Sequence, residues 1–357
     1  MTDRRDVIAS PAPPTSLRPP AEDAEQRKVL VGVDVGGSKV AVIVVDRSQR
    51  IRGRHTIPTA VGEPDGAAEH IASAVNAALA SAGVSLDDVS AVGVGVPGRI
   101  DPLTGVVSLA VNLGWHWLPL RDRLESILGV PCAIENDVRA AAAGILDRRL
   151  LGDVTDFVYL SVGTGISAGV VLDGSVHRGT RGLAGEIGHI VVDADGPRCP
   201  CGLAGCLETI ASGPAIARAA NEAIAAGRRS SLPGAGNLAA VDVYEAAAGG
   251  DPLAAEIVGR AGASLARAIN ALVMTYDVER IVLGGGVSRA GRVFLDPILH
   301  ELDAMRAASE LAAEMLPADI VANSPDGGDA GSWGGISVAR NLVTKRIEEV
   351  VAREANA

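Results

Sequence analysis

The chain has 357 residues, of which 48% are hydrophobic and 21% are charged, so it can build a core and is not wholly disordered. Its net charge of −11 and its aromatic content of 2% argue against a nucleic-acid or anionic-membrane surface. It contains no apolar run near the ~20 residues that span a bilayer, and no secretory signal follows its first arginines. We expect a cytoplasmic globular protein of one large or two medium domains.

Residues 1–28 hold five prolines between Pro11 and Pro20 and no apolar period, which indicates a disordered tail. From Val29 the pattern changes to two β-rich runs joined by glycines, which predicts a hairpin over residues 29–46. The next predicted elements are a helix over 67–83, strands over 91–98 and 131–137, and an alanine-rich helix from about Val138 to Leu150.

A second glycine hairpin is predicted over residues 157–174 and repeats the first one. Residues 34–38 align with residues 161–165 at an offset of 127, between apolar β runs in both cases. Two α/β lobes that each open with a glycine hairpin explain this repeat most simply. We expect an N-terminal lobe over 29–135, a larger C-terminal lobe over 136–335, and a final helix of about 336–357 that packs back on the first lobe.

Two segments match the dinucleotide-binding fingerprint G-x-G-x-x-G/A, namely residues 93–98 and 163–168. That fingerprint requires a helix to start directly afterwards, so that its N-terminus faces the pyrophosphate. The segments RIDPLTG and GVVLDG follow instead, and the chain has no Walker A loop. We therefore reject a dinucleotide site of this type.

The first hairpin is a better candidate for phosphate binding. Its glycines allow backbone N–H groups to approach an anion, its serine adds a hydroxyl donor, and its aspartate could hold Mg²⁺ through water. Lysine is rare here, with three in the chain against 29 arginines, so a lysine at this loop is informative. The alternative is an ordinary tight turn with an exposed lysine. The candidates in the two hairpins are Asp34, Gly36, Gly37, Ser38, Lys39, Gly163, Thr164 and Gly165.

The segments DVGGSK, GVGVPG, ENDVRAAA, VGTGISAG, AGEIGH and CPCGLAGCLE, in that order, resemble the ROK (repressor, open reading frame, kinase) family of sugar kinases. The resemblance runs from about Val29 to Ala339. It implies an α/β protein with the two-lobe actin-like ATPase (ribonuclease H-like) fold and an interlobe cleft. It also implies a homodimer that transfers the γ-phosphate of ATP to a hexose hydroxyl.

Asn136 and Asp137 stand where a predicted strand meets a helix. The helix dipole and free N–H groups there favour an ionised carboxylate, which suits a base for phosphoryl transfer. The resemblance implies that Asp137 is the general base and Asn136 a sugar ligand. The alternative is an N-cap pair, because asparagine and aspartate are preferred at that position in any protein.

His189, Cys199, Cys201 and Cys206 form a candidate zinc site over residues 189–206. Three thiolates and one imidazole are typical of a closed, structural zinc site, and the prolines and glycines among them keep the segment turning. Three reduced cysteines with a core histidine are the alternative, and a disulfide is disfavoured in a cytosolic chain.

The zinc loop would also place two carboxylates near each other, because Glu186 and Glu208 flank its ligands. Carboxylates accept strong hydrogen bonds from vicinal sugar hydroxyls, and His189 could bind zinc with one ring nitrogen and sugar with the other. The resemblance implies sugar contacts at Glu186, His189 and Glu208, and weaker ones at Gly98, Arg99 and Asn112. It implies adenosine contacts at Gly285, Gly286 and Gly331.

Three departures from the family pattern stand out. Ser38 replaces a threonine, Val138 and Arg139 replace small or polar residues, and Ser167 and Ala168 replace glycines of the second hairpin. We expect Arg139 to change the rim of the pocket. None of the departures removes a proposed catalytic group.

Several functions remain open at the level of sequence. Glucose is the favoured substrate, with N-acetylglucosamine or N-acetylmannosamine as alternatives and polyphosphate as another possible donor. A sugar-responsive repressor is disfavoured, because only about 28 proline-rich residues precede the first hairpin and they have no recognition-helix pattern. A catalytically silent sugar-binding protein is a third option, which intact Asp34, Lys39 and Asp137 disfavour.

Overall fold

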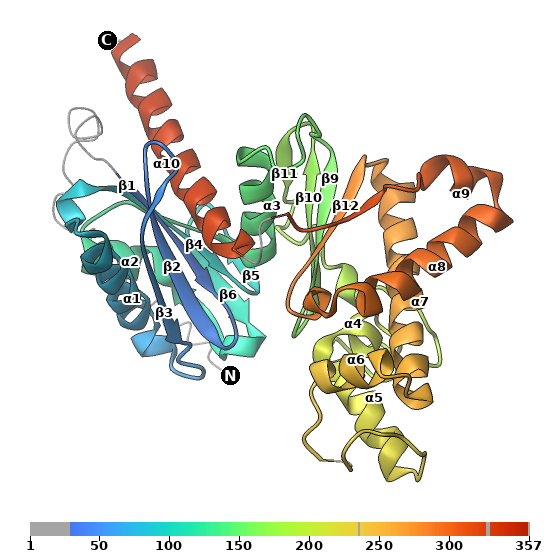
Figure 1. The fold of residues 1–357 in the computed structure, drawn as a ribbon. Helices are drawn as coiled ribbons and strands as arrows, with labels where there is room; N and C mark the ends of the chain where they lie inside the picture. The colour runs from blue at the N-terminus through green and yellow to red at the C-terminus, as the bar shows by residue number, and fades with distance from the viewer. Residues whose placement is uncertain (1–28, 235, 326–328, 356–357) are drawn as a thin grey trace, which may run out of the picture.

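The computed structural model describes residues 29–355 except residue 235 and residues 326–328, so the predicted tail lies outside the described residues. Figure 1 shows two α/β lobes, one coloured blue to cyan and the other green to orange. The last helix, drawn in red, returns to the first lobe. This arrangement confirms the two-lobe α/β fold expected from the repeated hairpin.

The first lobe is built on a five-stranded sheet in the order β3-β2-β1-β4-β8. Strands β1 to β3 are antiparallel neighbours, whereas β4 and β8 run parallel to β1. A small three-stranded sheet, β5-β6-β7, completes the lobe. The strands are β1 (Val29–Val35), β2 (Lys39–Asp46), β3 (Ile51–Pro58), β4 (Val89–Val96), β5 (Arg99–Asp101), β6 (Val106–Ala110), β7 (Trp115–Pro119) and β8 (Cys132–Asn136).

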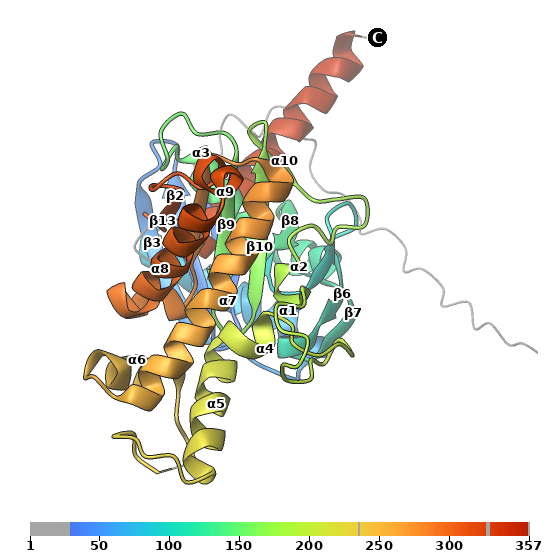
Figure 2. The same cartoon turned by 90° about the vertical axis from the view of Figure 1, so that its right-hand side faces the viewer.

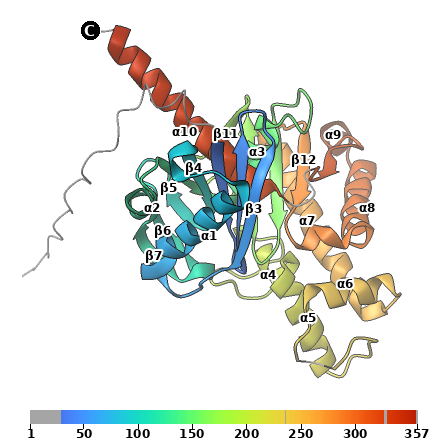
Figure 3. The same ribbon diagram turned by 60° about the vertical axis from the view of Figure 1, so that its left-hand side comes forward.

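Helices cover both faces of this sheet, as its continuous valine runs require. Helix α1 (Ala67–Ala82) packs on β2 and β3, and α2 (Leu120–Leu128) lies beside α1 and β8; both stand in front of the sheet in Figure 3. On the other face lies α10 (Ala330–Ala355). A Cβ at Gly32 would lie 2.2 Å from the carbonyl oxygen of Ser332, so β1 needs glycine there for α10 to pack.

The second lobe repeats this plan. Its sheet has the order β11-β10-β9-β12-β13, with an antiparallel hairpin followed by two parallel strands. The pairs Val35–Val40 and Val162–Ile166 close the two hairpins at corresponding points, which confirms the duplication. The strands are β9 (Phe157–Val162), β10 (Ile166–Leu172), β11 (Ser175–His177), β12 (Arg280–Gly284) and β13 (Val321–Asn323).

Helices of the second lobe form one large core with its sheet. They are α4 (Glu208–Ala211), α5 (Gly213–Ala225), α6 (Ala240–Ala248), α7 (Pro252–Tyr276), α8 (Arg292–Ala308) and α9 (Glu310–Met315). Among the described helices only α7 is long and apolar enough to cross a membrane by length and composition. It runs along α8 in Figure 2, and its apolar face is buried in this core, which accounts for its composition.

Two crossing helices join the lobes. Helix α3 (Asp137–Asp147) follows β8 of the first lobe and packs on β9 and β10 of the second. It crosses α10 at Gly144 and Gly334, where an added Cβ would lie 2.8 Å and 2.3 Å from backbone atoms of the other helix. Close glycine contacts of this kind fix the backbone of α3 relative to α10, and with it the residues at the start of both helices.

Candidate functional site

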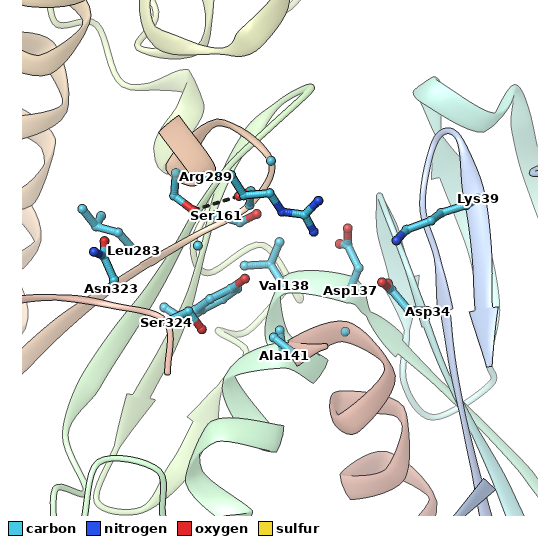
Figure 4. Close-up of a pocket in the computed structure, with 17 residues that line it drawn as sticks. Asp34, Lys39, Asp137, Val138, Ala141, Ser161, Leu283, Arg289, Asn323 and Ser324 are labelled. Carbon is cyan, nitrogen blue, oxygen red and sulfur yellow. Dashed lines mark hydrogen bonds between the residues drawn. The ribbon is translucent and has the colours of Figure 1, made fainter. Parts of the chain in front are cut away.

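A polar cavity of about 490 Å³ lies between the lobes, where β1, β2, β12 and the first turns of α3 and α10 meet. Asp34 and Lys39 from the first lobe and Asp137 from α3 lie close together in its wall (Figure 4). The second lobe contributes the glycine loop after β12 and Arg289. The cavity therefore combines two carboxylates, two cations and an accessible glycine backbone, which is a chemistry suited to a phosphate and a metal ion.

Asp137 is the first residue of α3, one residue before the predicted start of that helix. Asn136 caps the helix, with its side-chain oxygen accepting from the N–H groups of Val138 and Arg139, both at 3.1 Å. Burial and the neighbouring carboxylate of Asp34 raise the pKa of Asp137 to about 7. A carboxylate with a pKa near neutrality is a suitable general base.

Asp34 is the last residue but one of β1 and lines the same cavity. Burial raises its pKa to about 6, while Lys39 acts in the opposite direction. Gly331, in the first turn of α10, lies against this carboxylate: a Cβ there would be 2.3 Å from its carboxyl carbon. The resemblance implies that Gly331 contacts adenosine, and in the structure it lines the polar cavity beside Asp34.

Replacing Gly331 with alanine will displace the Asp34 carboxylate and lower kcat, while the helix should tolerate or favour alanine. We expect a loss of about 100-fold, the scale found when a catalytic group moves by about 1 Å. Steady-state kinetics over a range of Mg²⁺ concentrations would measure it. Gly259→Ala in α7, whose Cβ would meet nothing within 4 Å, is the matched control. Wild-type kcat in folded Gly331→Ala would show that the close contact is irrelevant.

The first hairpin turn lies at the rim of this cavity. Its backbone is fixed by the bond from Gly36 N–H to the Lys39 carbonyl at 2.8 Å, and by Thr59, whose hydroxyl donates to the Gly36 carbonyl at 2.7 Å. Gly37 and Ser38 are exposed. Asp34 and Lys39 line the cavity, whereas the three residues between them that were predicted to bind phosphate do not.

A second cavity of about 740 Å³ adjoins the first and is mainly apolar. The predicted hairpin residues Gly163 and Thr164 line this cavity, together with Tyr244 and Val287. Gly286 and Arg289 line both cavities. Gly285, with φ of +86° and a Cβ position 2.3 Å from the Val162 carbonyl oxygen, lets the loop pass close to β9.

The four predicted metal ligands lie together. Their ligand atoms are all within 4.8 Å of one another, with His189 Nδ1 3.6 Å from Cys199 Sγ and Cys201 Sγ 3.6 Å from Cys206 Sγ. All the cysteines are free thiols. Ligands ~2.3 Å from one tetrahedral ion would be separated by roughly 3.7 Å, so the donor set and its spacing fit zinc.

The predicted sugar ligands are spread over both lobes. The Asn136 amide donates to the Gly98 carbonyl at 3.2 Å, and the Glu208 carboxylate accepts from the Ile166 N–H at 2.8 Å, next to Gly165. Asn136 caps α3 with its side-chain oxygen and donates one amide hydrogen to Gly98, so its second amide hydrogen is available to a ligand. Of the predicted set Gly98, Arg99, Asn112, Asn136, Asp137, Glu186, His189 and Glu208, only Asp137 lines the polar cavity, and none lines the apolar one.

Arg139 differs from its prediction, because it is buried at 3% exposure rather than placed at a pocket rim. It pairs with Glu135 at 2.9 Å and donates to the Gly182 carbonyl at 2.9 Å, while Arg178 pairs with the other Glu135 oxygen at 2.7 Å. Burial opposes ionisation of Glu135, but the two guanidinium groups hold its pKa below the usual value. These bonds tie α3 to the loop that carries Glu186.

Two features of the site could not be recognised in the sequence: the Glu135–Arg139 ion pair and the position of Arg289 in the cavity wall. The Glu135–Arg139 spacing of four residues is a common ion-pair signal within a helix, but here it crosses the boundary between a strand and a helix. Arg289 gives no signal beyond its position shortly after the glycine loop, because arginine is abundant throughout this chain.

Comparison with known proteins matches residues 30–341 to the model of the ROK family. A glucokinase of Halalkalibacterium halodurans is 37% identical over 282 residues, covering 77% of this chain and 85% of that protein. An N-acetylmannosamine kinase of Yersinia pestis is 33% identical over 264 residues, with coverages of 73% and 83%. The crystal structure of a ROK family glucokinase from Streptomyces griseus in complex with glucose and AMPPNP has a TM-score of 0.75 at 32% identity, covering 88% of this chain and 99% of that one.

Proposed function

Because this chain belongs to the ROK family and has its two-lobe actin-like ATPase fold, we propose that it is an ATP-dependent hexose kinase, with glucose as its substrate. The observation that carries the proposal is the position of Asp137. Its carboxylate, with a pKa raised to about 7, stands at a helix N-terminus in a polar cavity with Asp34 and Lys39. An apolar cavity large enough for a nucleoside adjoins it.

In the proposed reaction the sugar hydroxyl gives its proton to Asp137 as its oxygen forms a bond to the γ-phosphorus. The bond from that phosphorus to the bridging oxygen breaks, and ADP leaves with the electron pair. Lys39 neutralises phosphate charge from the first lobe. Asp34 would hold Mg²⁺ through water, and the ion would supply charge neutralisation on the phosphates.

The nucleoside is assigned to the apolar cavity, whose wall includes Tyr244 and Val287. Its boundary with the polar cavity is the loop of Gly285 and Gly286, so a triphosphate can extend from one cavity into the other. Gly163, Thr164 and Gly165 are assigned to the donor as well, since Gly163 and Thr164 line the apolar cavity. The streptomycete relative, solved with glucose and AMPPNP, supports a donor of this class.

The sugar is assigned to Glu186, His189 and Glu208, held by a structural zinc ion on His189 and the three clustered cysteines. His189 faces Cys199 through Nδ1, which leaves Nε2 available to a sugar hydroxyl. Glu208 bonds to Ile166 with one carboxylate oxygen and keeps the other. Gly98, Arg99, Asn112 and Asn136 complete the proposed site from the first lobe.

The proposal is tested by measuring ADP release with Mg-ATP against glucose, mannose, fructose, N-acetylglucosamine, N-acetylmannosamine and no sugar. Preference for glucose is the expected result. The Yersinia relative makes an N-acetylated sugar the second candidate, and that outcome would change the pocket wall but no catalytic role. Replacing ATP with polyphosphate tests the donor. Folded, zinc-loaded protein that turns over no sugar would contradict the proposal and indicate a regulatory or binding role.

A further inference from the structure

Arg289 occupies the junction of the two cavities. It lies in the 3₁₀ helix η5 (Val287–Ala290), between the glycine loop after β12 and helix α8. Among the residues that the structure describes, it is the only charged one that lines both the polar and the apolar cavity. In Figure 4 its side chain extends from η5 into the polar cavity, and the guanidinium points toward Asp137.

The guanidinium of Arg289 is unpaired among the residues that the structure describes. It makes no hydrogen bond or ion pair with any residue in the described part of the chain, and its side chain is exposed. Three residues later, Arg292 is also exposed but pairs with Asp296 at 2.9 Å. Because Arg289 lacks such a partner in the described part of the chain, its five N–H donors are free to bind an anion that enters the cavity.

The position of this cation matches the path of a triphosphate. A donor with its base in the apolar cavity and its terminal phosphate near Asp137 must pass the junction that Arg289 lines. Lys39 is on the opposite wall, in the first lobe, so the two cations would meet the phosphate chain from different sides. The planar guanidinium forms paired hydrogen bonds to phosphate oxygens, which a single ammonium group cannot do.

We propose that Arg289 binds the phosphate chain of the donor and stabilises the charge on the departing diphosphate. This inference rests on the proposed kinase function. It makes Arg289 a binding residue supplied by the second lobe, in addition to the backbone of the glycine loop. It assigns no contact of Arg289 to the sugar or to the base.

The test compares Arg289→Ala, Arg289→Lys and the matched control Arg292→Ala with wild type. In Arg289→Ala we expect KM for Mg-ATP to rise about 10- to 100-fold, the effect of losing charged hydrogen bonds, with KM for glucose unchanged. Lysine should restore part of the loss, because it keeps the charge but not the paired geometry. Arg292→Ala should match wild type.

Two competitive inhibitors identify what Arg289 contacts. Inhibition by tripolyphosphate should weaken in Arg289→Ala by a similar factor, whereas inhibition by adenosine should stay the same. Unchanged tripolyphosphate inhibition, or weakened adenosine inhibition alone, would overturn the inference.

Direct titration of tripolyphosphate separates this inference from the proposed function. If wild type phosphorylates no sugar, the kinase proposal fails, but wild type should still bind tripolyphosphate more tightly than Arg289→Ala. Equal binding by the two proteins, or no binding by either, would overturn the role of Arg289 whatever the activity.

Discussion

Replacing Asp137 with asparagine will abolish sugar phosphorylation and leave the fold intact. Removing a general base typically lowers the rate by about 10²- to 10⁴-fold. Asparagine has nearly the same shape, and the cap of α3 comes from Asn136, so the helix start is preserved. The variant should retain sugar and nucleotide affinity within a few-fold, because the carboxylate acts on the proton and not on the nucleotide.

The same substitution should stabilise the protein at alkaline pH. Asp137 binds its proton more tightly when folded, because burial and Asp34 raise its pKa to about 7 from an ordinary value of 3.8. The folded state therefore holds more protons than the unfolded state between about pH 4 and pH 7, and this carboxyl lowers stability as pH rises through that window. Asparagine has no such titration, so thermal melts at pH 8 should show a Tm at or above that of wild type.

Activity and stability together identify the role of Asp137. The control is Asp122→Asn, an exposed aspartate on α2 that lines neither cavity, which should have wild-type rates. In wild type, kcat/KM should fall about tenfold per pH unit below about pH 7, because only the ionised carboxylate accepts the hydroxyl proton. Near-wild-type turnover in Asp137→Asn, or a flat profile from pH 5 to 8, would refute the assignment.

The architecture could be predicted from the sequence because its signals are local. Each hairpin is a short β run, a glycine turn and a second β run, so both can be found and aligned without reference to the fold. The dinucleotide fingerprint is correctly rejected on local grounds too. Gly93 lies in β4 and meets α10, since a Cβ there would be 2.0 Å from the Gly335 carbonyl oxygen.

The contacts within the cavity were harder to predict from the sequence than the architecture, because they join segments that are distant in the chain. Gly331 lies against Asp34 only because α10 returns across the first sheet, and no local pattern reports that crossing. Arginine is usually exposed, which favours a rim position for Arg139, but Glu135 and the Gly182 carbonyl accept from two of its nitrogens and offset part of the cost of burial. The family resemblance predicted which residue types form the site, and the fold determines which residues each of them contacts.

The proposed zinc ion should be required for catalysis as well as for stability, because its last ligand, Cys206, directly precedes residues of the core and of the proposed sugar site. Leu207 is fully buried, and Glu208 bonds to the Ile166 N–H at the start of β10. Between His189 and Cys206 the chain has no regular strand or α-helix, and the isolated bridges Val191–Cys206 and Arg198–Ala204 are its only β pairing. A loop held by turn bonds, such as that from the Cys199 N–H to the Leu203 carbonyl at 2.8 Å, and not by regular secondary structure, depends on metal coordination for its shape.

Removing zinc with a chelator, or replacing Cys206 with serine, should therefore lower activity by at least about 100-fold and lower the Tm. Loss of the ligands would release both His189 and Glu208 from their places, and misplaced binding groups have costs of that size. Zinc content, measured by elemental analysis, should fall from one ion per chain in step with activity. Cys132→Ala is the control, because this buried thiol lies in β8 and outside the cluster, so zinc content should not change. A zinc-free preparation with full activity would separate the metal from the sugar site and leave Glu186 and Glu208 positioned by the protein alone.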